Sequence, residues 1–422
     1  MPPKIESLPV PTTRGKDAKE WMEYHGFVAT TPSIRSSDYE GVLHCPFQYY
    51  LSRRLGLTPA LRWSKALSRG SWFHKRLELY KEEKTAASQI MEAQLQDRLG
   101  ELTEICMSLG IKGSSRDTVL ERERNDCRCA MGWFDACWNL PFGPKRTTLD
   151  FFINQSHFRT IGSELGIRLQ LPSSSPTKKI QVVALYDLLL YHEVQNTLFI
   201  VDAKTCSESA TDCLITCPLE FQTQHYMMIL KNALKTKQLQ KKFDLPDDVG
   251  VGGMIHLAIQ KPTIEFGMKD RDCEEYEHTL KSGPRKGQIE IRKTYTGEPR
   301  LTNYIKRCNN WYEGTGEYEH LAPKWATDPP INISLTYGST LLDPAYVQEY
   351  DTRLKIIADY ARCPPLPYHF PRSMSHLRQF GRLSPFTPFY LLPPKEWPDL
   401  IRKEGFIQLD RDEGLEFIVD TK

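Results

Sequence analysis

The sequence predicts an α/β (α+β) protein in which helices flank a central mixed sheet, and three features support this prediction. Apolar residues recur at helical spacing through much of the first 140 residues. Two apolar runs follow at 180–191 and 197–204, separated by the polar segment HEVQN, which is the pattern of a β-hairpin. A helical segment and a further strand come next. Helices, antiparallel strands, a helix and a strand in this order are typical of a mixed α/β core.

The predicted elements follow this order along the chain. They are a loose arm at 1–32, helices within 36–57, a helix at 68–83, a helical insertion at about 88–140, strands at 151–153 and 167–171, the hairpin strands 180–191 and 197–204, a helix at 218–242 and a strand at 253–261. Ser68 is suited to cap its helix. We expect residues 33–262 to form the core and residues 263–422 a mixed extension that wraps it.

The composition is that of a soluble globular protein. Of the 422 residues, 40% are hydrophobic and 26% are charged. No stretch approaches the roughly 18 apolar residues that a membrane span needs. Residues 1–14 lack the apolar segment of a signal peptide. We therefore expect no membrane contact and a cytoplasmic location, in the host cytoplasm if the protein is viral.

Charge and cysteine content restrict the possible functions only in part. The 55 basic and 53 acidic residues nearly cancel, but a basic groove around an acidic metal site would average out in that total. The 11 cysteines are irregularly spaced and lack paired CxxC motifs, so reduced thiols are expected rather than disulfides or zinc ligands. No G-x-x-x-x-G-K-[ST] motif is present, so any helicase motor would be a separate partner.

Two carboxylates and a lysine in the predicted hairpin carry the strongest chemical signal. Asp187 lies within an apolar strand, where a charge is costly unless it is paired or binds a metal. Asp202 ends the second apolar run, and the hairpin can bring the two carboxylates side by side. Hard cations such as Mg²⁺ prefer such oxygen ligands, and the carbonyl of Ala203 could assist. Lys204 lies two residues beyond Asp202 and thus on the same strand face, where its ammonium could stabilise charge on a phosphate. A solvated strand end is the alternative interpretation of this short pattern.

Three further motifs lie on predicted helices. Gly70 and His74 share one helix, and Cys45-Pro46 begins an earlier one. Gln222 and Tyr226 are four residues apart and share one face of the helix that follows the second hairpin strand. Each motif alone is typical of ordinary structural residues.

The five motifs, in this order, resemble the RecB-like branch of the PD-(D/E)XK nucleases, which includes AddB and the CRISPR-adaptation nucleases. That branch shows a Cys-Pro-aromatic helix, a G-x-x-x-H helix, a strand Asp, a strand D-x-K and a Q-x-x-x-Y helix. The resemblance covers roughly residues 33–261 and implies a restriction-endonuclease-like core. The long insertion between His74 and Asp187 means that substrate preference is not transferable from relatives.

The resemblance also implies a role for each matching residue. His74, Asp187 and Asp202, with the Ala203 carbonyl, would bind Mg²⁺ or Mn²⁺. Lys204 would position the attacking water. The remaining pair, Gln222 and Tyr226, would contact the nucleic-acid backbone or brace the site. The implied reaction is hydrolysis of a phosphodiester bond by metal-activated water.

Some relatives also hold an iron–sulfur cluster, with one early cysteine and a late cysteine triplet. Cys45 fits the early position, but Cys308 and Cys363 are isolated, and residues 377–389 hold no cysteine. Because such clusters need four ligands, we predict no iron–sulfur cluster.

The leading hypothesis is a hydrolase, a metal-dependent deoxyribonuclease that acts as an exonuclease or end-processing nuclease on single- or double-stranded DNA. Its context would be DNA replication, repair or defence in bacteria or phage, with a helicase or other replication or repair partner. The alternatives are a DNA-binding or scaffold subunit with little catalysis and an RNA-directed nuclease. Beyond the core, the segment 281–287 (KSGPRKG) is interpreted as a flexible basic loop.

Overall fold

The computed structural model describes residues 33–59, 61, 65–80, 83–138, 140–141, 157–171, 180–364, 366–373, 378–379, 382–408 and 417–420. Two predictions lie outside these residues: the arm at 1–32 and the strand at 151–153.

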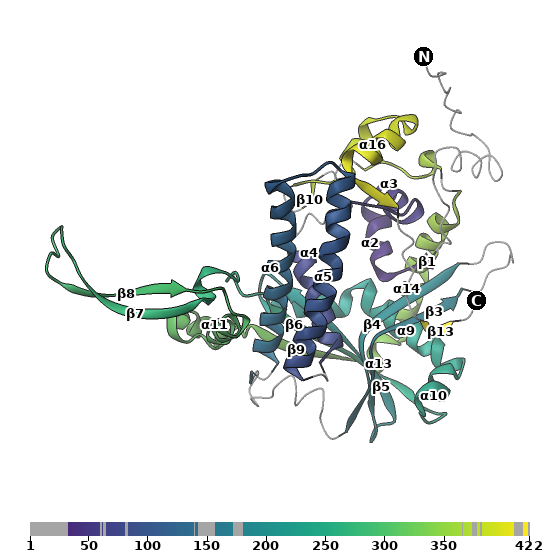
Figure 1. Ribbon diagram of the computed structural model, residues 1–422. Helices are drawn as coiled ribbons and strands as arrows, with labels where there is room; N and C mark the ends of the chain where they lie inside the picture. The colour runs from purple at the N-terminus through teal and green to yellow at the C-terminus, as the bar shows by residue number, and fades with distance from the viewer. Residues whose placement is uncertain are drawn as a thin grey trace, which may run out of the picture.

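A seven-stranded mixed sheet forms the centre of the protein (Figure 1). Its strand order is β13 (Phe417–Asp420), β3 (Phe158–Gln170), β4 (Gln181–His192), β5 (Thr197–Cys206), β6 (Gly250–Gln260) and β9 (Ile331–Tyr337), with β1 (Ser33–Ile34) paired to β4. Strand β4 runs antiparallel to its neighbours β3 and β5, β5 and β6 run parallel, and β9 is antiparallel to β6. Together with the helices on both faces, this confirms the predicted fold class.

One helical layer packs on the face of the sheet that carries Val201 and Ile255. It consists of α4 (Lys65–Glu78), α5 (Lys84–Ser108), α6 (Ser114–Cys137) and α11 (Leu301–Glu313). Phe73, Trp133 and Trp311 are buried there in one apolar cluster with the strand residues. Helices α5 and α6 stand as the long pair near the centre of Figure 1 and lie in the region where a helical insertion is predicted; that this region is an insertion stays a prediction.

A second layer covers the opposite face. It consists of α2 (Ser36–His44), α3 (Pro46–Tyr49), α9 (Phe221–Lys235) and α14 (Pro344–Arg362). Phe47, Leu230 and Ile357 are buried there with Tyr186 and Ile200 of the sheet. The core therefore has two apolar layers separated by the strands.

Shorter elements complete the chain. They are a π-helical turn (Tyr50–Arg54), β2 (Leu57–Pro59) paired with β12 (Phe406–Gln408), α8 (Ala210–Thr216), α10 (Gln238–Phe243), β7 (Asp272–Thr279), β8 (Ile289–Thr296), α12 (Ala322–Trp325), α13 (Gly338–Leu341), β10 (Arg378–Gln379), β11 (Arg382–Leu383), α15 (Thr387–Leu391) and α16 (Trp397–Glu404), with short 3₁₀ turns between them.

Three predicted boundaries are wrong. The helix expected at 68–83 is α4, so Ser68 is a buried residue within it and not its cap. The helix expected at 218–242 is two helices, because Lys237 adopts a left-handed conformation with φ of 60° and ends the helical path. The strand expected at 167–171 begins earlier, at Phe158; its glycines and polar residues hide the period-two pattern.

The C-terminal part of the chain adds strands and core residues to this fold. Strand β9 pairs with β6 in the central sheet. Trp397 of α16 is fully buried and packs edge-on against Phe47 of α3. The division at residue 262 stays a prediction. Within the described ranges, no helix is long and apolar enough to cross a membrane.

Candidate active site

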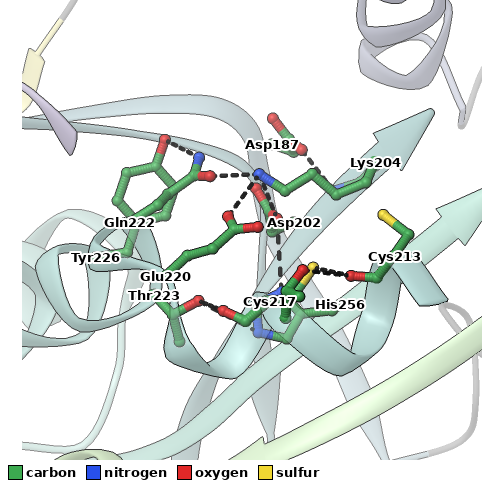
Figure 2. Close-up of polar contacts among 12 residues, drawn as sticks. Asp187, Asp202, Lys204, Cys213, Cys217, Glu220, Gln222, Thr223, Tyr226 and His256 are labelled. Atoms are coloured by element: carbon green, nitrogen blue, oxygen red, sulfur yellow. Dashed lines mark hydrogen bonds and ion pairs between the residues drawn. The ribbon is translucent and has the colours of Figure 1, made fainter. Parts of the chain in front are cut away.

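The hairpin of β4 and β5 brings the predicted carboxylates together. The two strands pair from His192↔Thr197 to Leu188↔Val201, and the next residue on each strand is Asp187 and Asp202. One carboxylate oxygen of Asp187 accepts a hydrogen bond of 2.7 Å from the Ala203 amide (Figure 2). The aspartates therefore lie where the two strands begin to separate.

The regular alternation of β4 is interrupted at Asp187. Tyr186 and Leu189 face one apolar cluster, whereas Leu188 and Leu190 face the other. On the neighbouring strand, Glu164 adopts φ of 47°, a region that non-glycine residues rarely occupy. Such local irregularities re-aim side chains, and unfavourable backbone conformations cluster at functional sites.

Buried polar contacts with α6 fix the rotation of helix α4 about its own axis. Arg69 pairs with Asp126 at 2.7 Å, and Arg76 pairs with Asp135 at 2.6 Å. Between them, Trp72 donates an indole hydrogen bond of 2.9 Å to Glu123. Residues 69, 72 and 76 share one helix face because they are three and four positions apart. The opposite face, which carries His74, therefore points to the sheet.

His74, Glu164 and Asp187 form a group that could hold a metal ion. Their ligand atoms all lie within 4.8 Å of one another, and no other such group of three occurs in the part of the chain that the structure describes. His74 Nδ1 lies 3.1 Å from a carboxylate oxygen of Asp187. One imidazole and two carboxylates suit a divalent cation such as Mn²⁺ or Mg²⁺, so the residues fit the predicted cofactor.

The electrostatics of this group follow from its crowded negative charge. Burial alone would lower the pKa of His74, but Asp187, Glu164 and Asp202 outweigh it and raise the pKa to about 9. Burial and the nearby carboxylate of Asp187 raise the pKa of Glu164 to about 7. The site thus attracts positive charge, which is what a cation site requires.

Asp202 and Lys204 form an ion pair beside this group. Asp202 is buried, and its Oδ2 lies 3.2 Å from Lys204 Nζ. Burial would raise the pKa of Asp202, but His256 and Lys204 lower it below its ordinary value. Burial would lower the pKa of Lys204, and Asp202 and Glu220 outweigh this effect and raise it. Both groups are therefore charged at neutral pH.

Gln222 and Tyr226 extend the network along α9. Lys204 Nζ donates to the Gln222 side-chain oxygen and lies 3.6 Å from Glu220, while Gln222 Nε2 donates to Tyr226 Oη at 3.1 Å (Figure 2). The hydroxyl of Tyr186 donates to the Tyr226 carbonyl at 3.1 Å, which fixes the helix to β4. The structure therefore brings Gln222 of the Q-x-x-x-Y pair to the lysine, with Tyr226 bonded to Gln222.

Sequence reasoning missed two residues of this site. Glu164 lies in a glycine-containing segment without clear alternation, and its approach to Asp187 arises from the pairing of β3 with β4. His256 of β6 is in register with Asp202, its Nδ1 lies 3.5 Å from Asp202 Oδ2, and its Nε2 lies 3.5 Å from the Thr223 hydroxyl. A histidine within the apolar strand GMIHLAIQ was the available signal.

Cys45, which fits the early cluster position, and Cys217, near Asp202, both have structural contacts. Cys45 accepts a hydrogen bond from the Gln48 amide at the start of α3 and lies 2.6 Å from Tyr390 Oη. Cys217 donates to the Cys213 carbonyl at 3.1 Å, below the active-site network in Figure 2.

The comparison with protein families agrees with the fold. The chain matches the family model of the PD-(D/E)XK nuclease superfamily over residues 36–304, and it belongs to this superfamily. The match spans all seven residues named from sequence, as well as Glu164 and His256. Membership indicates a metal-dependent nuclease. A search of curated proteins found none that matches.

Proposed function

We propose that the protein is a metal-dependent deoxyribonuclease of the RecB-like branch, which acts as an exonuclease or in processing DNA ends. One observation carries this proposal: the Asp187 carboxylate of β4, the Asp202–Lys204 pair of β5 and His74 of α4 come from three separate segments of the chain and converge on one site. The order of motifs along the chain supports the RecB-like assignment.

The residues divide the work according to their chemistry. His74, Glu164, Asp187 and Asp202 would hold Mg²⁺ or Mn²⁺, with the Ala203 carbonyl as a further ligand. When bound, the cation would supply a water of lowered pKa and polarise the scissile phosphate. Glu164 joins the set proposed from sequence because it lies in the same group as His74 and Asp187.

Lys204 is the residue that would act on the phosphodiester directly. Its ammonium is held by Asp202, Glu220 and Gln222, so its position is fixed before substrate arrives. A fixed cation stabilises charge that develops on a phosphate oxygen and orients the attacking water. Tyr226 braces Gln222 and thereby the lysine.

The test is cleavage of end-labelled DNA and RNA oligonucleotides, single- and double-stranded, with Mg²⁺, with Mn²⁺ and with EDTA. Wild type is compared with Asp202→Asn, which keeps the shape of the buried side chain. We expect metal-dependent cleavage of DNA that falls at least about 100-fold in the variant, which corresponds to about 2.7 kcal/mol of transition-state stabilisation. The product ladder distinguishes exonuclease from endonuclease action. DNA binding without cleavage by wild type would contradict the proposal and favour a binding subunit.

A further inference from the structure

Strands β7 and β8 form a two-stranded arm, residues 272–296, that projects away from the body of the protein (Figure 1). Most of its strand residues are exposed, including Tyr276, Ile289 and Ile291, and none is buried. An isolated two-stranded hairpin is only marginally stable in water. The arm buries no apolar layer, so it contributes little to the stability of the fold, and its presence points to a role in binding.

The root of the arm is firmly anchored. Asp270 is buried, accepts a hydrogen bond of 2.8 Å from the Gly267 amide, and pairs with Arg307 of α11 at 2.9 Å. Asn303 donates to the Asp270 carbonyl at 3.0 Å, and Arg300 pairs with Asp272 at 2.8 Å. The direction in which the arm leaves the body is thus fixed by its root, while its tip has solvent on all sides.

Charge is distributed unevenly along the arm. The tip, residues 280–288, contains Lys281, Arg285 and Lys286 and no acidic residue. All three are exposed. The shaft strand β7 carries Asp272, Glu274, Glu275 and Glu277. Strand β8 adds Glu290, Arg292 and Lys293, and Lys293 pairs with Glu275 at 3.1 Å, so the shaft keeps only a partly compensated negative charge. A polyanion is therefore attracted to the tip more than to the shaft.

The arm leaves the sheet at the end that carries the candidate active site. Strands β5 and β6 are parallel, and Cys206, two residues beyond Lys204, is in register with Gln260 at the end of β6. Twelve residues after Gln260 the chain enters the arm at Asp272. Arg69 of α4, the helix of His74, pairs with Glu265 in this connection. Eight residues per strand at about 3.3 Å each give a reach of about 25 Å, or about seven base pairs of DNA at 3.4 Å.

We propose that the basic tip of the arm binds the phosphate backbone of duplex DNA at a distance from the cleavage site, as a second point of contact with the substrate. This inference rests on the proposed function for the identity of the nucleic acid. The contact is independent of base sequence because it involves only lysine and arginine with phosphate. It acts on duplexes long enough to reach from the active site to the tip.

The experiment compares wild type with the tip variant Lys281→Gln/Arg285→Gln/Lys286→Gln. The matched control is Lys355→Gln/Lys395→Gln/Lys403→Gln, which removes the same charge from exposed positions elsewhere. Fluorescence anisotropy in EDTA gives the affinity for a 40-base-pair duplex and for a stem-loop of six base pairs across a salt series. Since none of the tip residues packs in the core, thermal unfolding should be unchanged.

We expect the tip variant to bind the 40-base-pair duplex at least about tenfold more weakly, with the slope of log affinity against log salt reduced by about 2–3. Affinity for the stem-loop should not change, and the control should bind both as wild type does. Unchanged binding of the long duplex would overturn the inference. An equal loss of affinity for the duplex and the stem-loop would also overturn it. A third contrary result would be self-association of the protein that Ile291→Lys abolishes, while the salt dependence of DNA binding is the same in the tip variant and in wild type.

The two proposals fail separately. If the tip variant loses affinity for long DNA but wild type cleaves no nucleic acid, the nuclease proposal fails and the arm contact stands. If wild type cleaves DNA and the tip variant binds it normally, the arm contact fails and the nuclease proposal stands.

Discussion

At the residue scale, Asp187 links the two halves of the candidate site. One of its carboxylate oxygens lies 3.1 Å from His74, and the other accepts from the Ala203 amide. The Asp187 carboxylate thus holds His74 of α4 close to the backbone between Asp202 and Lys204. Its position in an apolar strand, which the sequence made conspicuous, is what allows this double contact.

His256 is expected to hold Asp202 in its orientation, and two amide substitutions separate its two contacts. Asparagine places an amide near the position of Nδ1, which faces Asp202, and glutamine places one near Nε2, which faces Thr223. We expect His256→Gln to lower kcat about 10- to 100-fold, the usual effect of removing such a supporting contact, and His256→Asn to lower it much less. Equal losses in both variants, with equal loss of thermal stability, would mean that His256 serves packing alone.

His225 makes stability depend on pH. Its Nε2 lies 3.1 Å from the Val183 carbonyl and its Nδ1 lies 3.2 Å from the Tyr350 hydroxyl, and burial lowers its pKa to about 4. Between pH 6.5 and pH 4 the unfolded chain binds a proton that the folded protein excludes, so stability falls as pH falls through this window. Relative to His225→Gln, wild type should lose about 2 kcal/mol of unfolding free energy between pH 7 and pH 5. Denaturant unfolding at both pH values measures it; parallel pH curves would contradict it.

At the scale of elements, the packing of α6 against α11 sets how closely the insertion approaches the sheet. Gly132 of α6 lies against the ring of Tyr304, which a Cβ atom at residue 132 would overlap. Tyr304 also accepts a hydrogen bond of 3.0 Å from the Trp133 indole. Because this ring is fully buried, it has no room to retreat.

Gly132→Ala should therefore destabilise the fold by about 1–3 kcal/mol through overpacking. Gly100→Ala in α5 is the matched control, since nothing lies within 4 Å of its added Cβ. Replacing a glycine in an open helix position should instead stabilise the protein by up to about 1 kcal/mol. Thermal denaturation of both variants measures the two changes in stability. Two changes of the same sign would contradict this account.

The elements also show what sequence could predict and what it could not. Asp187, Asp202 and Lys204 were identifiable because charges in apolar strands are rare and the hairpin fixes their proximity. Glu164 was not, because its position depends on pairing between strands and on an unusual backbone conformation. The break at Lys237 was missed because no proline or glycine marks it; the left-handed residue is a lysine.

At the scale of the whole molecule, the candidate site lies between the two helical layers, where the pairing of β4 and β5 ends. Helix α4 of one layer supplies His74, and α9 of the other supplies Gln222 and Tyr226. Strand β6, which carries His256, continues toward the root of the arm. Substrate binding at the site would therefore contact both layers, with the arm as a remote support.

The most direct test of the central claim separates metal binding from cleavage in one set of proteins. Mn²⁺ binding by calorimetry and single-turnover DNA cleavage are measured for wild type, Lys204→Met and Asp187→Asn. We expect Lys204→Met to bind Mn²⁺ and to cleave at least about 100-fold more slowly, because it loses the cation that acts on the phosphate and keeps the ligands. Asp187→Asn should lose both properties. Cleavage by Lys204→Met at the wild-type rate, or Mn²⁺ binding by Asp187→Asn with wild-type affinity, would contradict the assignment of this site.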